Sequence, residues 1–420
     1  MKRIAENRKK AKEFFENVRN QCWLMEEMAE VMVTGKEALD RCMMNMGKIL
    51  AEGVMLFERE KLAGGDYDPR DEYQKWGSQP GSIYLGDQKV KVNHPRVRDG
   101  EGEVALSSYD QMKNPKEFSE EMLSRALRGM SARKYEETVT ELGEEFGISP
   151  TSISNRLVEA TTRKLKELKE RDLSDVDLFA LFLDTVHRGG RAFVVAVGID
   201  IKGKKRVLGF WEGETENKEV CKSLLSDLES RNLKLSEAVI YVTDGGKGII
   251  SSLKAKFGSD LIHQRCTIHK DRNIQHHLPD RYRDEAHRRF TNALALKDCN
   301  DAEEALNDFE RWLREINESA ADSLCEAKEE LLTLHKLKAP HLLRKTLHTT
   351  NPIESMFSIV RHCEKNVKRY YGSKMSQRWL AAICLYAEDQ FRTVRGHRHI
   401  AEVIHQIKIE QNKKIEKQAA

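Results

Sequence analysis

The chain has 420 residues, too long for one ordinary hydrophobic core, so two or three domains are expected. Lysine and arginine (71) nearly balance aspartate and glutamate (68), so the net charge of +3 does not by itself indicate a nucleic-acid binder. A charged fraction of 33% is typical of a soluble, helix-rich intracellular protein. We find no signal peptide, no run near the roughly 20 apolar residues that span a bilayer, and no disulfide framework among the scattered cysteines. These features exclude secreted and membrane classes and predict a cytoplasmic protein without a membrane partner.

The first part of the chain changes texture near residue 63. Residues 1–62 are predicted to be helical, because apolar residues recur every three or four positions among charged ones. Residues 63–114 contain glycine and Asp-Pro breaks between short strand-like pieces, which predicts a small β-hairpin or three-stranded insert. We expect the N-terminal helices to contribute to dimerisation.

Residues 115–172 carry the pattern of a helix-turn-helix. Gly147 permits a tight turn, Ile148 anchors it, and Ser149 caps a second helix whose first position is Pro150. That helix presents short polar and cationic side chains suited to base edges and phosphates. These candidate DNA-binding residues are Thr151, Ser152, Asn155 and Arg156. Plain three-helix packing is the alternative interpretation of the same pattern.

An α/β pattern begins at about residue 173. Three strands come first, followed by a helix, a strand, a helix and a last short strand. This order predicts an RNase H-like core with a five-stranded mixed sheet, in which the first and fourth strands are neighbours. We place the first part of this core at 173–279, a helical insertion at 280–340, and the second part, with basic C-terminal helices, at 341–420.

Three acidic residues are placed to share a metal site. Asp184 ends the apolar run of the first strand, Asp244 ends that of the fourth strand, and Glu354 lies just after Asn351-Pro352 at a helix start. Carboxylates suit Mg²⁺, and two such ions can activate a nucleophilic oxygen and stabilise a leaving oxygen in phosphodiester transfer. We therefore predict a catalytic site that binds two Mg²⁺ ions, with Mn²⁺ as an alternative. Taken singly, an aspartate after an apolar run is more often a turn or cap residue than a metal ligand, and the three acids together on this strand order are the stronger signal.

Two further features belong to this hypothesis. Arg361 follows Glu354 by about two helical turns, and Lys365 extends the same cationic stripe, so both are candidates for binding substrate phosphate. Trp312, in the helical insertion, is a candidate for stacking on a base at a cleaved DNA end. Its alternative role is a core tryptophan of the helical bundle.

Four blocks of the chain resemble those of Mutator-type transposases, in particular their bacterial insertion-sequence branch. The blocks are Leu183-Asp184-Thr185-Val186-His187, Thr243-Asp244-Gly245-Gly246-Lys247-Gly248, Gln264-Arg265-Cys266-Thr267-Ile268-His269-Lys270 and Thr350-Asn351-Pro352-Ile353-Glu354-Ser355-Met356. The resemblance spans roughly 115–400 and implies Mg²⁺-dependent DDE chemistry, with Asp184, Asp244 and Glu354 as the triad. It also carries the family's Cys-x-x-His pair onto Cys266 and His269, as active-site support or a DNA phosphate contact.

The chain departs from that pattern at Thr185, where members of the family often have glycine, and the triad assignment is unaffected. Cys266 and His269 supply only half of a tetrahedral zinc site, and no second pair follows at the usual spacing, so we do not expect zinc.

The sequence thus predicts a DNA transposase that binds the terminal inverted repeats of an insertion sequence and joins them to target DNA. We expect a homodimer, because two ends must be held together, acting on double-stranded DNA at the bacterial nucleoid. A junction-resolving nuclease on the same core is one alternative, although it would need neither the helix-turn-helix nor the insertion. A non-enzymatic DNA-binding regulator is the other, and it would be expected to lack a carboxylate.

Overall fold

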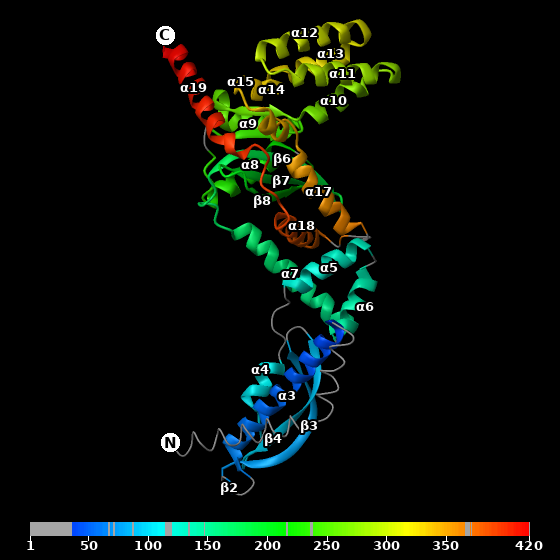
Figure 1. Ribbon diagram of the computed structural model, residues 1–420, viewed down its shortest axis with the longest axis vertical. Helices are drawn as coiled ribbons and strands as arrows, with labels where there is room; N and C mark the ends of the chain where they lie inside the picture. The colour runs from blue at the N-terminus through cyan, green and yellow to red at the C-terminus, as the bar shows by residue number, and fades with distance from the viewer. Residues whose placement is uncertain are drawn as a thin grey trace. The chain divides into compact units, whose positions relative to one another are not determined.

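The computed structural model describes residues 36–65, 68–69, 72–85, 88–113, 120–132, 135–146, 148–215, 217–235, 238–365, 370 and 372–419. The helix predicted over residues 1–35 lies outside these ranges. The chain divides into two compact units, each formed from two segments (Figure 1). The first comprises Met1–Ala126 and Glu136–Leu157, and the second Leu127–Tyr135 and Val158–Ala420.

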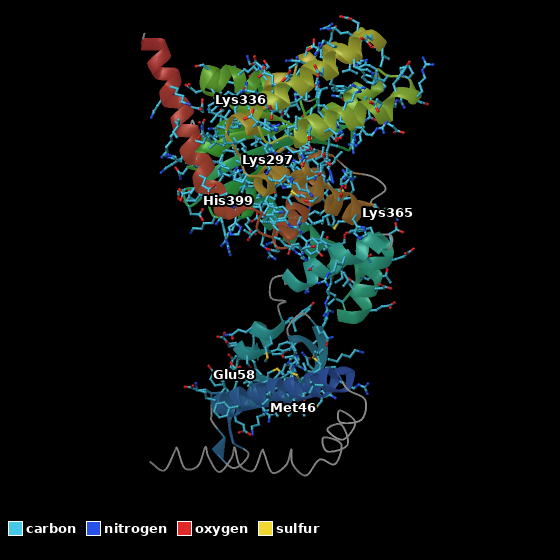
Figure 2. All side chains as sticks on the ribbon, turned by 45° about the horizontal axis from the view of Figure 1, so that its top comes forward. Met46, Glu58, Lys297, Lys336, Lys365 and His399 are labelled. Atoms are coloured by element: carbon cyan, nitrogen blue, oxygen red, sulfur yellow. The ribbon has the colours of Figure 1, made fainter. Side chains whose placement is uncertain are left out.

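In the first unit, a long helix packs on a three-stranded antiparallel sheet. Its elements are α3 (Lys36–Ala63), the short pair β1 (Gly64–Gly65) and β2 (Asp68–Pro69), the sheet strands β3 (Gln74–Leu85), β4 (Gln88–Arg98) and β5 (Glu103–Val104), and α4 (Ser107–Lys113). Met55 of α3 and Ile83 of β3 are fully buried in their shared core. Glu58, labelled on α3 with Met46 in Figure 2, accepts the backbone N–H groups of Ser107 and Ser108 at 2.9 and 2.8 Å and so caps α4. All three strands of this sheet lie within residues 63–114, and the assignment of that segment as a separate insert stays a prediction.

Three helices follow, namely α5 (Glu120–Ala132), α6 (Tyr135–Phe146) and α7 (Pro150–Glu170). The turn between α6 and α7 is tight, since Ile148 N donates to Gly143 O at 2.9 Å. A Cβ on Gly143 would lie 2.8 Å from the backbone oxygen of Ile148, so a larger residue would force the turn to shift. Ser152 N donates to Ser149 Oγ at 3.2 Å, which makes Ser149 the cap predicted for α7.

The second unit is built on a five-stranded mixed sheet with the order β10-β9-β6-β7-β8. The strands are β6 (Leu178–Arg188), β7 (Arg191–Asp200), β8 (Lys205–Gly213), β9 (Ile240–Thr243) and β10 (Ile262–Arg265). β6, β7 and β8 form an antiparallel meander, whereas β9 is parallel to both β6 and β10. Gly189 and Gly190, both at positive φ, make the first hairpin turn. The predicted strand order, with the first and fourth strands adjacent, is confirmed.

Helices cover both faces of this sheet (Figure 1). On one face, α8 (Lys218–Ser230) and α9 (Lys247–Phe257) bury Leu224 and Ile249 against inward residues such as Leu183. Successive strand residues point to opposite faces, so Phe182, which lies between Leu181 and Leu183, faces the other side. There α17 (Asn351–Glu364) contacts β6 and α18 (Ser373–Glu388) contacts β8.

Between β10 and α17 the chain is helical, and α19 (Ile400–Ala419) ends it. The intervening helices are α10 (Thr267–His276), α11 (Asp280–Ala295), α12 (Cys299–Ile316), α13 (Glu318–Cys325), α14 (Lys328–Leu331), α15 (Thr333–Lys336) and α16 (His341–Leu347). α10 to α14 share a hydrophobic core of their own that includes Phe290 and Phe309. Within the described ranges, no helix is both long and apolar enough to cross a membrane.

The sheet core sets a first prediction. Phe182 is fully buried at the centre of β6, so Phe182→Ala leaves a cavity and should cost about 3–5 kcal/mol of stability. Thermal unfolding followed by circular dichroism should show a clearly lower midpoint, whereas Lys222→Ala on the exposed side of α8 should leave it unchanged. Equal midpoints for the two variants would contradict this account of the core.

Candidate active site

Parallel pairing of β6 with β9 brings the two aspartates together. Leu183 of β6 is paired with Thr243, the last residue of β9. Asp184 and Asp244, the residues that follow this pair, therefore lie side by side. One expectation needs correction: Asp184 is not at the end of its strand, because β6 continues to Arg188 and Asp184 itself pairs with Val195 of β7. The hairpin with β7 prolongs β6 beyond the point where β9 stops. Asp184 is thus held inside the sheet, and Asp244 lies in the turn that follows β9.

Glu354 reaches the same place from the first turn of α17. Pro352 at the helix start fixes the entry, and Thr350 precedes it. The Thr350 hydroxyl donates to Glu354 Oε1 at 2.7 Å, while Glu354 N donates to Thr350 O at 2.9 Å. The carboxylate is therefore oriented by its own helix cap.

The three carboxylates act on one another electrostatically. Burial, followed by the charge of Asp244 and to a lesser extent that of Glu354, raises the pKa of Asp184 to about 7, against 3.8 ordinarily. The Thr185 N–H, 2.7 Å from Asp184 Oδ1, and the charge of His269 oppose this rise. Several acids crowded at a buried position are the arrangement that a divalent cation relieves.

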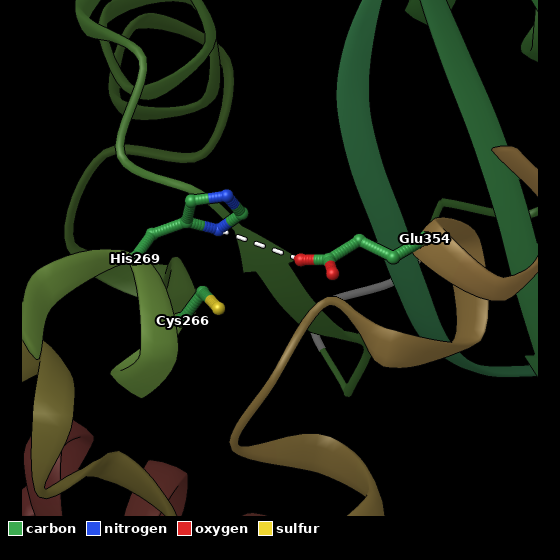
Figure 3. A group of neighbouring side chains, drawn as sticks. All are labelled: Cys266, His269 and Glu354. Carbon is green, nitrogen blue, oxygen red and sulfur yellow. Dashed lines mark ion pairs between the residues drawn. The ribbon is translucent and has the colours of Figure 1, made fainter. Parts of the chain in front are cut away.

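Cys266 and His269, at the start of α10, complete the cluster (Figure 3). His269 Nδ1 lies 3.7 Å from Glu354 Oε1, the ion pair drawn in Figure 3, and 3.4 Å from Thr350 Oγ1. A hydrogen bond with Cys266 is the largest cause that raises the pKa of His269, to about 9. Burial alone would raise the pKa of Cys266, but hydrogen bonds from His269 and Thr350 outweigh it and lower that pKa. The pair therefore favours an imidazolium beside a thiolate.

The donor set fits a divalent cation. Asp184, Asp244 and Glu354 offer the hard oxygen ligands that Mg²⁺ and Mn²⁺ prefer. Ligand atoms of Cys266, His269 and Glu354 also lie within 4.8 Å of one another, and this is the one such group found among the described residues. One thiolate, one imidazole and one carboxylate could hold a softer ion, so the structure permits a metal contact at the Cys-x-x-His pair that the spacing alone did not indicate.

Sequence analysis missed a buried polar network behind Asp244. Thr243 Oγ1 lies 2.9 Å from His263 Nε2, and Glu330 on α14 pairs with both His263 Nδ1 at 3.3 Å and Arg265 Nε at 3.1 Å. The Arg265 guanidinium lies directly against Gly245, where an added Cβ would come within 1.7 Å of Nη1. The glycine after Asp244 was the available signal, since it marks a close approach of another group.

The remaining predicted site residues are placed as follows. Arg361 is exposed on α17 with Nη2 3.2 Å from Ser358 Oγ, and Lys365 is exposed at the end of that helix (Figure 2). Their contact with phosphate stays a prediction. Trp312 packs half-buried in the helical core, with Arg289 4.9 Å from its ring centroid, and stacking on a DNA base likewise stays a prediction.

The predicted DNA-reading residues of α7 differ in exposure. Thr151 and Asn155 are exposed and Ser152 is half-buried beside Ser149, with 2.9 Å between their hydroxyl oxygens. Arg156 is buried, with its guanidinium 4.9 Å from the centroid of the Tyr84 ring. A base or phosphate contact by Arg156 would require that stacking to open, whereas Thr151 and Asn155 are accessible as they stand.

Taken together, a mixed sheet whose adjacent strands deliver two aspartates, joined by a glutamate from a covering helix, gathers three carboxylates that interact electrostatically, and their role as metal ligands stays a prediction. Comparison with known proteins agrees with the motif resemblance. The family model described as "Transposase, Mutator family" matches residues 23–394, and the chain belongs to this family.

Its relatives are named as transposases of bacterial insertion sequences. The transposase for ISRM3 of Rhizobium meliloti is 26% identical over 86% of this chain and 90% of its own length. That for IS256 in transposon Tn4001 of Staphylococcus aureus is 26% identical over 73% of this chain and 78% of its own. A solved structure, a pre-cleavage Mos1 transpososome, matches 34% of this chain and 58% of its own with 16% identity and a TM-score of 0.13, too low to support an argument about the fold.

Gly245 provides a test of how Asp244 is positioned. Its φ of +107° and the close guanidinium of Arg265 mean that Gly245→Ala must displace the turn carrying Asp244. We expect Mn²⁺ affinity, measured by calorimetry, to fall at least about tenfold, or 1.4 kcal/mol. Gly190→Ala is the matched control, because Gly190 also has positive φ but nothing lies within 4 Å of its added Cβ. Wild-type Mn²⁺ affinity in Gly245→Ala would refute the positioning role.

The raised pKa of Asp184 predicts a pH-dependent stability without metal. Between about pH 4 and pH 7, Asp184 keeps its proton in the folded chain but loses it in the unfolded chain. The free energy of unfolding therefore falls as pH rises through this range. Asp184→Asn should therefore raise the free energy of unfolding, measured by urea denaturation in EDTA, by up to a few kcal/mol at pH 8. At pH 4 the same substitution should change it little. The exposed Asp260→Asn should shift neither. A gain for Asp184→Asn that is the same at both pH values would contradict the assignment.

Proposed function

We propose that the protein is a DDE transposase that binds the ends of an insertion sequence and catalyses Mg²⁺-dependent DNA cleavage and strand transfer. The observation that supports this most is the convergence of Asp184, Asp244 and Glu354 from two adjacent strands and a covering helix. Membership of the Mutator transposase family and the names of the relatives point the same way.

The proposed chemistry assigns a role to each side chain. When bound, two divalent ions activate the attacking oxygen and stabilise the leaving oxygen of the phosphodiester. Asp184, Asp244 and Glu354 would hold those ions, and Thr350 orients Glu354 by its 2.7 Å hydrogen bond. The charged His269 beside Glu354 would offset negative charge from the DNA backbone, with Cys266 keeping the imidazole protonated.

The rest of the chain fits the handling of DNA in this proposal. The five-stranded sheet forms an RNase H-like core over 173–279 and 341–420, with 280–340 as its helical insertion. Residues 115–172 form a helix-turn-helix that reads the terminal repeats through Thr151 and Asn155. Arg361 and Lys365 contact phosphates of terminal or target DNA, and a homodimer holds the two ends together. Residues 1–62 contribute the dimer interface. Residues 63–114 form a small β insert between that region and the helix-turn-helix.

Strand transfer tests this proposal. The substrates are duplexes made from the DNA that flanks this reading frame on each side, with Mg²⁺ or Mn²⁺ and a target plasmid. Asp184→Asn, Asp244→Asn and Glu354→Gln should each slow cleavage and joining on the order of 10³-fold or more, because each removes a charged ligand. Asp260→Asn, which changes an exposed acid, should react at the wild-type rate.

The outcomes separate the alternatives. A wild-type rate in any of the three variants would remove that residue from the triad. Cleavage of four-way junctions without preference for the flanking DNA would indicate a resolvase instead. Specific binding of the flanking DNA without metal-dependent cleavage would indicate a regulator.

A further inference from the structure

A cavity lies beside α10, the helix that begins next to Cys266 and carries His269. It has a volume of about 330 Å³, within the range of roughly 300–1,000 Å³ common for small-molecule sites. Its walls come from α10, α11, α14, α15 and α16. Thr267, the residue after Cys266, lines it, and Thr267 N donates to the carbonyl of His348, another lining residue, at 2.9 Å. The cavity therefore shares a wall with the carboxylate site without including any of its acids.

His335 gives this cavity an unpartnered acceptor. The side chain is 5% exposed, and its Nε2 lies 3.1 Å from Leu296 O. A carbonyl only accepts, so Nε2 carries the hydrogen. Burial, together with the charge of Arg344, lowers the pKa of His335, so the ring is neutral and Nδ1 is a bare acceptor. Nδ1 is closed off from solvent and has no hydrogen-bond partner among the described residues, so a ligand donor reaches it by displacing the neighbouring lining.

His348 has the same arrangement in the other tautomer. Its Nδ1 lies 2.8 Å from Arg344 O and must donate to it, which leaves Nε2 as an acceptor because burial lowers the pKa of His348. Each of these two rings therefore offers one acceptor nitrogen to a hydrogen-bond donor.

Arg344 adds an unbalanced charge to the same wall. It is 8% exposed and places Nη1 2.9 Å from Leu296 O, yet it has no ion pair with a carboxylate among the described residues. Burying an uncompensated guanidinium is costly, and a ligand with an acceptor or a negative charge would offset that cost. Lys345 and His341, both exposed, line the cavity as well.

The rest of the lining is part apolar, from Phe290, Leu294, Leu331 and Leu334, and part polar, from Thr291 and from Asp271, whose Oδ2 lies 2.7 Å from His287 Nδ1. A ligand that suits the whole cavity has a flat apolar body, a hydrogen-bond donor for His335, an acceptor for Arg344 and a phosphate near Lys345. A nucleobase on its phosphate combines these properties. We propose that this cavity binds a nucleobase, supplied as an extrahelical nucleotide of the DNA held at the carboxylate site.

This inference rests on the proposed function for the source of the base, but not for the existence of the site. The same chemistry could be met by a free nucleotide, and the experiment is arranged to tell the two sources apart. It uses the full chain and 2-aminopurine, a fluorescent base with both an amino donor and a ring acceptor. One probe is a duplex carrying 2-aminopurine opposite an abasic position, and the other is free 2-aminopurine deoxyriboside monophosphate.

Three variants sharpen the measurement. Thr291→Trp places a large side chain at the lining of the cavity, and Asn292→Trp places the same side chain one residue on, at an exposed position that does not line it. His335→Phe keeps the ring but removes the acceptor, while Leu296 O still accepts from Arg344. Fluorescence of the duplex probe should change on binding to the wild type and to Asn292→Trp. We expect the affinity for the unpaired base to fall about tenfold in His335→Phe and further in Thr291→Trp.

Binding of a fully paired duplex, followed by anisotropy, should be equal in all four proteins, and equal unfolding midpoints show that each variant folds. An unchanged signal in Thr291→Trp, or duplex binding without any fluorescence change, would overturn the inference. If only the free nucleotide bound, in a manner blocked by Thr291→Trp, the cavity would be a nucleotide site and the DNA source would be wrong. If no duplex bound at all, the proposed function would fail, and the free-nucleotide titration would decide the cavity by itself.

Discussion

The parallel pairing of β6 with β9 is the constraint on which the candidate site depends. It sets Asp184 beside the turn that carries Asp244, and a one-residue slip would send one carboxylate to the opposite face of the sheet. Glu354 can then join from α17, because α17 lies against β6 on the face opposite α8 and α9. The position of the third acid follows from sheet packing rather than from its distance along the chain.

The electrostatics of the site oppose its own assembly. Burial and neighbouring acids disfavour ionised Asp184, and the Thr185 N–H and the charge of His269 oppose this effect, while Thr350 donates to Glu354. Folding energy elsewhere, in the apolar faces of the sheet, holds these like charges together. Such an arrangement is more stable when a cation is bound than without it, which is typical of sites that use metal ions in catalysis.

Much of this was predictable from the sequence. Apolar runs, glycine turns and the crossover helices indicated the strand order, because these signals are local and the rules of connection are few. The continuation of β6 past Asp184 was not predictable, since Thr185-Val186-His187-Arg188 is only partly apolar and its strand form depends on pairing with β7. The burial of Arg156 under Tyr84 and the network of Arg265, His263 and Glu330 were missed for the same reason. They join residues that are far apart in the sequence, and no periodicity records such contacts.

The packing of Arg265 against Gly245 has a mechanical meaning. Arg265 also pairs with Glu330 of α14 and, at 3.3 Å, with Glu326, which holds the fully buried Lys270 of α10 at 2.6 Å. These side chains connect α10, α13 and α14 to the turn that carries Asp244. Arg265 packs so closely against Gly245 that no space is left between them. A displacement of α13 or α14 would therefore reach the turn that carries Asp244 through one arginine.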